Sequence, residues 1–134
     1  MGRFETEWLA RPENLVALAD LPGQWIDAVH KRRQPRVVVL DMDSSESPTY
    51  GAREGSAYNG HFGCTCYHPL FVFNQLGNLE RCALRSGNVH SAASWREVLE
   101  PVVAGSFGAA VPGKAVDRLW VRVGSSRRRP SRRV

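Results

Sequence analysis

Two acidic residues leave the end of an apolar run, and their spacing suits the binding of a hard metal ion. Asp41 follows the run Val37–Leu40 directly, and Asp43 comes two residues later. Side chains two apart on a strand share one face, about 6.6 Å apart along the chain, and an unpaired buried carboxylate is costly, so a cation or several hydrogen-bond donors should lie nearby. Mg²⁺ takes oxygen ligands and needs only one or two protein carboxylates, which is the chemistry of phosphoryl transfer. The alternative is that Asp43 caps the turn into Ser44 and Ser45, and spacing alone favours this capping role.

A second set of candidate ligands lies in "HFGCTCYH", which contains His61, Cys64, Cys66 and His68. These are the residue types of a zinc site. The two cysteines would share a face of a strand, but the histidines lack the fixed reach of zinc-finger spacings. Small packing cysteines and locally bonded histidines are therefore the favoured interpretation.

Aromatic residues nearby allow a further alternative. Tyr67, Phe71 and Phe73 could stack on the bases of a nucleic acid, but apolar alternation in a hairpin more often indicates core packing, which we favour. His90 and Trp95 are interpreted as residues that position the start of a helix, rather than as catalytic and stacking groups.

The elements that position these residues are predicted by apolar periodicity. Residues 6–33 predict two short helices, with Pro12 suited to a first helical position and "LPG" at 21–23 ending the first. The run at 37–40 predicts a central strand covered on both faces. The Gly-, Ser- and Pro-rich stretch 44–63 predicts an irregular functional loop.

The second half of the chain predicts a hairpin and a helix. "HPLFVFNQ" and "LERCALR", joined by an "LGN" turn, are typical of a β-hairpin. Ser94 and Glu97 resemble a capping box, and apolar residues at 95, 98, 99, 102 and 103 form one helical face, which Pro101 should kink or shorten. "RLWVRV" is strand-like, and "SSRRRPSRRV" predicts a disordered tail.

Charge is concentrated at one end of this 134-residue chain, whose length predicts one domain. The formal net charge is +5, yet residues 1–117 hold 11 Lys and Arg against 13 Asp and Glu. The excess comes from Arg118, Arg122, Arg127, Arg128, Arg129, Arg132 and Arg133. This arm would attract phosphate, and a small non-catalytic nucleic-acid-binding protein acting through its Arg-rich tail is thus an alternative function.

Cysteine usage indicates the compartment. Three cysteines, an odd number, occur in a chain with no apolar segment that could serve as a secretory signal, which favours a reduced, cytoplasmic setting. No apolar run approaches the length of a membrane helix, so no membrane association is expected.

Residues 38–104 resemble the start of the catalytic domain of DDE-class bacterial insertion-sequence transposases, specifically group 1, the insertion-sequence family numbered thirteen-eighty. The resemblance lies in the Asp-rich strand end, in "GAREGSAYNGHFGCTCYHPL" and in "LRSGNVHSA". It implies an α/β (α+β), partial ribonuclease H-like fold: a mixed sheet with a β-hairpin and flanking helices. It also implies Mg²⁺-dependent cleavage at transposon ends and transfer of the freed 3′ hydroxyl to target DNA. Asp43 would be the first catalytic, metal-binding carboxylate, with Asp41 as second choice.

The resemblance fades after Ala104, and the residues beyond it depart from the family's pattern. A DDE site needs a second carboxylate on the strand after the helix and a third on a later helix, whereas residues 123–126 are Val, Gly, Ser and Ser. Asp117 lies before that strand, and a shifted reading frame in GC-rich DNA would encode an Arg-rich end of this kind. We therefore expect a truncated, inactive transposase remnant, with no DNA-end-binding region ahead of its core.

The expected division is a helical lead-in at 1–36, a partial catalytic domain at 37–104 and a divergent basic tail at 105–134. DNA is the partner that the resemblance implies. An intact transposase is a further candidate partner, through mixed assembly.

Overall fold

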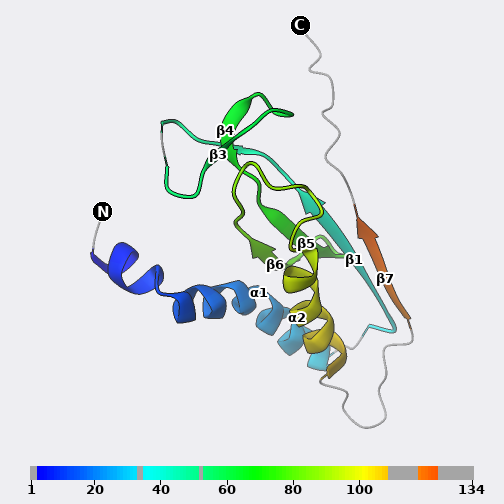
Figure 1. The fold of residues 1–134 in the computed structure, drawn as a ribbon. Coiled ribbons are helices and arrows are strands. Elements are labelled where there is room, and N and C mark those ends of the chain that lie inside the picture. Colours follow the sequence, from blue (N-terminus) through cyan, green and yellow to red (C-terminus); the bar gives the residue numbers. More distant parts are fainter. Residues whose placement is uncertain (1–2, 33–34, 52, 109–117, 124–134) are drawn as a thin grey trace, which may run out of the picture.

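The computed structural model describes residues 3–32, 35–51, 53–108 and 118–123, and in this part of the chain a four-stranded mixed sheet carries helices on one face (Figure 1). The elements are η1 (Phe4–Leu9), α1 (Pro12–Arg32), β1 (Val37–Ser44), β2 (Ser47–Pro48), β3 (Ala57–Asn59), β4 (Cys64–Tyr67), β5 (Leu70–Asn74), β6 (Leu79–Ala83), α2 (Trp95–Gly108) and β7 (Arg118–Val123). The predicted mixed α/β class with a mixed sheet and flanking helices is confirmed.

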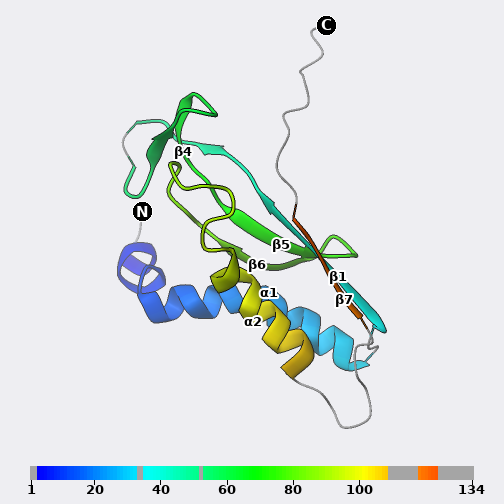
Figure 2. The ribbon, with the colours of Figure 1, turned by 45° about the vertical axis from the view of Figure 1, so that its right-hand side comes forward.

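β1 lies in the middle of the sheet, whose strand order is β6-β5-β1-β7. β5 pairs with it antiparallel and β7 parallel. The predicted central strand and the β5–β6 hairpin are thus confirmed. Coverage of β1 on both faces is wrong for the described residues, because its burial alternates and Val37 is 40% exposed. Helices α1 and α2 lie on the same side of the sheet (Figure 2).

The hydrophobic core lies between the sheet and α2. It contains Val38, Leu40 and Met42 of β1, Leu70 and Val72 of β5, and Val98, Leu99 and Val102 of α2. The predicted apolar face of α2 therefore does pack on the sheet, and the helix continues through Pro101 to Gly108 instead of ending there. Ser94 precedes it with φ of 54°, a left-handed conformation that differs from the extended one of a usual N-cap.

The prediction of two short helices in residues 6–33 is wrong, because α1 is one helix of 21 residues with Pro22 inside it. Pro22 removes one backbone hydrogen bond, but tertiary contacts hold the helix together. A Cβ at Gly23 would lie 3.3 Å from the carbonyl oxygen of Glu80, so glycine lets α1 approach β6 closely. One turn before, Asp20 forms an ion pair with Arg81 of β6.

The stretch 44–63 is also more regular than predicted. β2 and β3 pair antiparallel with opposite edges of β4 and form a small three-stranded sheet in the described part, next to the end of β1 (Figure 1). Gly87 packs so tightly on it that a methyl group there would overlap the carbonyl oxygens of Ala57 and Cys66. The short strands form because β4 offers backbone partners on both edges, which composition alone does not reveal.

No helix among the described residues is long and apolar enough to cross a lipid bilayer. β7 is the strand predicted from "RLWVRV". Asp117 and the tail predicted to be disordered, residues 125–134, lie outside the described residues.

Candidate active site

Asp41 and Asp43 lie on the face of β1 that points away from the helices. Both are half-buried, while Leu40 and Met42, which alternate with them, belong to the core. Strand alternation therefore places both acids on one face, as the sequence predicts. Among the described residues no helix covers that face (Figure 2).

The neighbouring strands give the two acids different surroundings. Asp41 is in register with Phe73 on β5 and with Arg122 on β7. Asp43 is in register with Phe71 on β5. Residues paired across adjacent strands direct their side chains to the same face. Asp41 therefore has a cation on the next strand, and Asp43 has an aromatic ring.

One hydrogen bond and the absence of an ion pair bear on the two roles considered for Asp43. Its Oδ1 accepts a hydrogen bond of 2.9 Å from the backbone N–H of the next residue, Ser44, within β1, whereas an Asp that caps a turn accepts from a residue two further on. Neither Asp41 nor Asp43 forms an ion pair with any residue of the described part. A half-buried charge without a counter-ion favours the arrival of a cation.

The donor set fits a hard divalent ion. The two carboxylates offer only oxygen atoms, and Mg²⁺ usually takes one or two carboxylates from a protein. No group of three or more His, Cys, Asp or Glu able to hold a metal occurs among residues 3–32, 35–51, 53–108 and 118–123. Asp43 and Asp41 can therefore supply part of a Mg²⁺ shell, and substrate oxygens and water would complete it.

Phe71 and Phe73 flank the acids on the open face. Their rings stack with centroids 6.0 Å apart and planes 29° apart. Both are half-buried and lie outside the core cluster, so the core-packing interpretation is wrong for this pair. Tyr67 lies elsewhere, on β4, and its hydroxyl donates a hydrogen bond to the carbonyl of Glu54.

The cysteine and histidine residues at 61–68 occupy different surroundings. Cys66 is fully buried, and burial, with Cys64 as a second cause, raises the pKa of its thiol. His68 is buried with Nδ1 3.1 Å from the carbonyl oxygen of Val89, while His61 is exposed. The cysteines of this chain are free thiols in the structure.

Backbone N–H groups close the segment before α2 onto His90. His90 accepts hydrogen bonds from two backbone N–H groups, its carbonyl from Ala93 and its Nδ1 from Ala92. Trp95 is the first residue of α2, and the guanidinium of Arg96 lies 5.3 Å from its ring centroid. His90 and Trp95 therefore have structural surroundings.

Two arginines went unassigned at the sequence level. Arg122 comes next to Asp41 only because β7 pairs with β1, and no pattern within "RLWVRV" names that partner. Arg85 is buried and donates hydrogen bonds to the carbonyls of His68, Ser91 and Ala93. The sequence offers one indication that Arg85 matters, which is its place within "LRSGNVHSA", one of the stretches that carry the resemblance.

Comparison with known proteins gives one family. Residues 1–114 match the family described as Transposase DDE domain group 1. No curated protein and no solved structure matches the chain.

Proposed function

Because the chain belongs to the Transposase DDE domain group 1 family, we propose that its sheet is the core of an insertion-sequence transposase that cleaves and transfers DNA strands, with Asp43 as the first metal-binding carboxylate. The observation that carries this proposal is a pair of half-buried carboxylates without ion-pair partners in the described residues, on the open face of a central strand. We also propose the finer placement in the insertion-sequence family numbered thirteen-eighty.

A ribonuclease H-like fold is the architecture we propose for this core. The order of elements supports it: a first strand that bears the acids, then a hairpin, then a helix. β7 adds a parallel strand beside β1, at the edge where the carboxylates lie. We retain residues 37–104 as the catalytic part, with 1–36 as a helical lead-in and 105–134 as a divergent basic segment.

We assign the metal to Asp43 before Asp41 because of Arg122. The positive charge of Arg122, in register with Asp41 on the next strand, disfavours a second cation at Asp41. Asp43 has Phe71 as its β5 neighbour and a single hydrogen bond from the N–H of Ser44. Asp43 thus gains more from a bound cation.

Mg²⁺ bound there would act as a Lewis acid on the phosphate oxygens of DNA. The chain's own residues orient the site. The N–H of Ser44 donates to Oδ1 of Asp43, and Phe71 and Phe73 are the neighbours of Asp43 and Asp41 on β5. DNA is thus the proposed partner, and the free cysteines support the proposed cytoplasmic location.

We further propose that this chain by itself does not complete the reaction. β7, the strand next to β1, carries no acidic residue over Arg118–Val123. Mixed assembly with an intact transposase would then be its route to an active site. A plasmid-excision assay with the purified chain tests this proposal, and Mg²⁺-dependent excision by the chain alone would contradict it.

The metal assignment is tested by Mg²⁺-dependent stability. Thermal and urea unfolding of the full chain should show about 1.4 kcal/mol of stabilisation when free Mg²⁺ is about ten times its Kd. Asp43→Asn should abolish the gain and Asp41→Asn should retain most of it, whereas Glu97→Gln on the exposed surface of α2 is the matched control. Equal gains in wild type and Asp43→Asn would refute the assignment.

The Arg-rich end supports a second candidate, a non-catalytic nucleic-acid-binding protein, because seven arginines lie in residues 118–134. Such binding would weaken steeply with salt and would show no sequence preference. Removing residues 124–134, which hold five of these arginines and leave β7 in place, should weaken it strongly. Unchanged affinity would exclude the tail, and retained Mg²⁺ binding by the same variant would separate the two candidates.

A further inference from the structure

Cys64 and Cys66 lie two residues apart on β4, so their side chains project from the same face of the small sheet. Their register partners on β3 are Asn59 and Ala57, which point to that face as well. Both thiols are free in the structure. The small sheet thus presents two neighbouring sulfur atoms, and the proposed strand cleavage uses neither of them.

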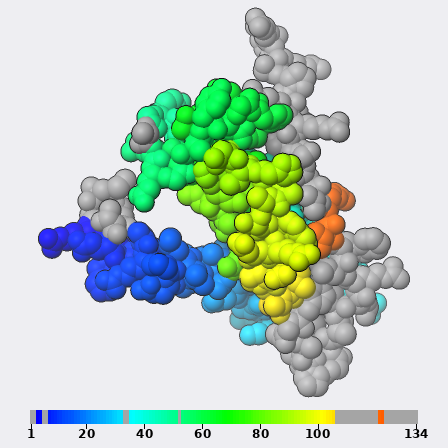
Figure 3. Space-filling view, viewed as in Figure 1, coloured from blue at the N-terminus to red at the C-terminus, as the bar shows by residue number. Residues whose placement is uncertain are grey.

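The two thiols differ in access. Cys66 is fully buried, whereas Cys64 keeps part of its surface open. The backbone at Gly87 lies against the carbonyl oxygen of Cys66, and its own carbonyl accepts a hydrogen bond of 2.5 Å from the side chain of Asn59. Figure 3 shows the small sheet, in green, at the end of the molecule away from the last turn of α1. A ligand would therefore reach the pair from the Cys64 end.

The state of the thiols favours a ligand that displaces protons. Burial raises the pKa of the Cys66 thiol, and the charge and hydrogen bonding of Cys64 raise it further. A buried thiol with a raised pKa is protonated at neutral pH and reacts slowly with oxidants. A metal ion that binds thiolates instead releases their protons as it binds.

The backbone of β4 holds the two side chains too far apart for a disulfide. Side chains two apart on a strand start about 6.6 Å apart, whereas the Cβ atoms of a disulfide lie about 3.8 Å apart. β4 pairs with β2 on one edge and with β3 on the other, so its backbone cannot shorten without losing those hydrogen bonds. A bridging ion requires less movement, because two thiolate–metal bonds of about 2.3 Å let the sulfur atoms stand about 4.6 Å apart.

The number of ligands selects the ion. Cysteine thiolates select zinc, iron–sulfur clusters and Cu(I). Structural zinc and iron–sulfur clusters take four protein ligands. In the part of the chain that the structure describes, no group of three or more His, Cys, Asp or Glu is able to hold a metal. Cu(I), a soft ion that is stable with two sulfur ligands, remains.

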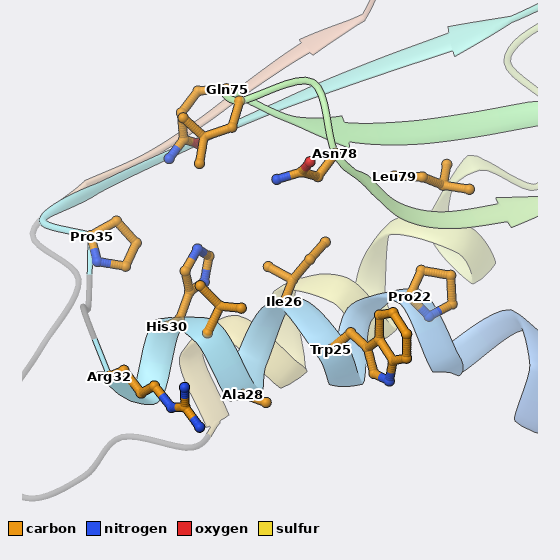
Figure 4. A pocket seen from close by; sticks show the side chains of 12 residues that line it. Pro22, Trp25, Ile26, Ala28, His30, Arg32, Pro35, Gln75, Asn78 and Leu79 are labelled. Carbon is orange, nitrogen blue, oxygen red and sulfur yellow. The ribbon is translucent and has the colours of Figure 1, made fainter.

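The groove between α1 and the β5–β6 turn offers no comparable pair. It has a volume of about 1100 Å³, and the side chains that line it are mostly apolar (Figure 4). His30 is the one metal-ligating side chain among its described lining residues. Asp41 and Asp43 offer only oxygen atoms, which suit a hard ion. Within the described residues, the arrangement that suits a soft ion is therefore the thiol pair of β4.

We propose that Cys64 and Cys66 bind one Cu(I) ion between their two thiolates, on the face of the small sheet. Binding releases the two thiol protons to solvent and leaves copper and sulfur in their oxidation states, so no oxidant or reductant takes part. The site is independent of the carboxylates on β1, because each set of donor atoms selects a different class of ion.

Competition with the Cu(I) chelator bicinchoninate tests the proposal on the full chain, kept reduced and free of oxygen. The absorbance of the chelator complex measures how much Cu(I) the protein removes. The wild type should remove one Cu(I) per chain. Cys64→Ala should raise the Kd at least about a hundredfold, because a second ligand on the same strand binds at a high effective concentration. Cys82→Ala, which removes the thiol of β6, is the matched control and should bind as the wild type does.

Cys66→Ala should weaken binding to the same extent, and far-UV circular dichroism shows whether this buried replacement folds. If it does not fold, Cys64→Ala at the half-buried position decides the question alone. A wild type that removes no Cu(I) would overturn the proposal. Wild-type affinity in Cys64→Ala, or lost affinity in Cys82→Ala, would do the same, because the ion would then depend on other ligands. Copper X-ray absorption should show two sulfur neighbours, and a larger number would contradict a site made by this pair.

Discussion

Arg85 is a buried cation whose replacement tests how α2 is held against the sheet. Its side chain donates hydrogen bonds of 2.9, 3.0 and 2.6 Å to the carbonyl oxygens of His68, Ser91 and Ala93. Hydrogen bonds to charged groups contribute about 1.5–3 kcal/mol each. Burial opposes them: the residue is 8% exposed, its Nη2 has no partner within the described chain, and burial lowers the pKa of the guanidinium.

We expect Arg85→Met to lose about 2–4 kcal/mol of unfolding free energy, because one buried and two partly buried carbonyls lose their donors while the desolvation cost of the cation disappears. Urea unfolding followed by far-UV circular dichroism measures this loss. The unfolding free energy of Arg85→Lys should lie between those of Arg85→Met and wild type, since an ammonium cannot reproduce the planar fork of hydrogen-bond donors. Arg96→Met, on the exposed side of α2, should stay within about 0.5 kcal/mol of wild type. An Arg85→Met variant as stable as wild type would show that desolvation cancels the three bonds.

Two further predictions concern Glu80 and Gly87. Glu80 is buried and accepts a hydrogen bond from Asn74, and burial raises its pKa above the ordinary 4.5. Its contribution is therefore fully present below pH 4.5 and is lost as pH rises through the raised folded-state pKa. Glu80→Gln, which keeps the acceptor, should flatten this dependence and raise the melting temperature at neutral pH; parallel melting curves of the two proteins against pH would contradict this. Gly87→Ala should cost more than about 2 kcal/mol by forcing its methyl group into two carbonyls of the small sheet, whereas Gly60→Ala, with open space around it, should cost less than about 1 kcal/mol in the same urea titration.

Local patterns predicted the elements whose reasons are local. The hairpin, the apolar face of α2 and the central position of β1 are explained by alternation, periodicity and β-branched composition. The continuity of α1 is not explained by local patterns, because "LPG" ends a helix unless tertiary contacts hold the residues beyond it. Here the close approach of Gly23 to β6 and the Asp20–Arg81 ion pair hold it. Both contacts join residues far apart in sequence, and no window along the chain contains them.

The candidate site also has one feature that the sequence predicts and one that only the fold reveals. The common face of Asp41 and Asp43 results from strand alternation, so the sequence predicts it. Arg122 becomes a neighbour of Asp41 only through the pairing of β7 with β1, across about 80 residues of chain. A ranking of the two acids as metal ligands therefore needed the sheet, and the spacing of the acids could not provide it.

The register of β1 explains why an apolar run can end in acids. Leu40 and Met42 point into the core, and a slip of one residue would exchange them with Asp41 and Asp43, burying both charges. Gln75 helps to fix the register, because its Oε1 accepts a hydrogen bond of 2.9 Å from the N–H of Val39. That hydrogen bond lies at the start of β1, and the carboxylates lie at its end. The core packing that excludes a slip of register therefore also fixes the face on which the acids lie. Stability and chemistry thus depend on the same alternation, and a metal site on this face requires no residue to leave the core.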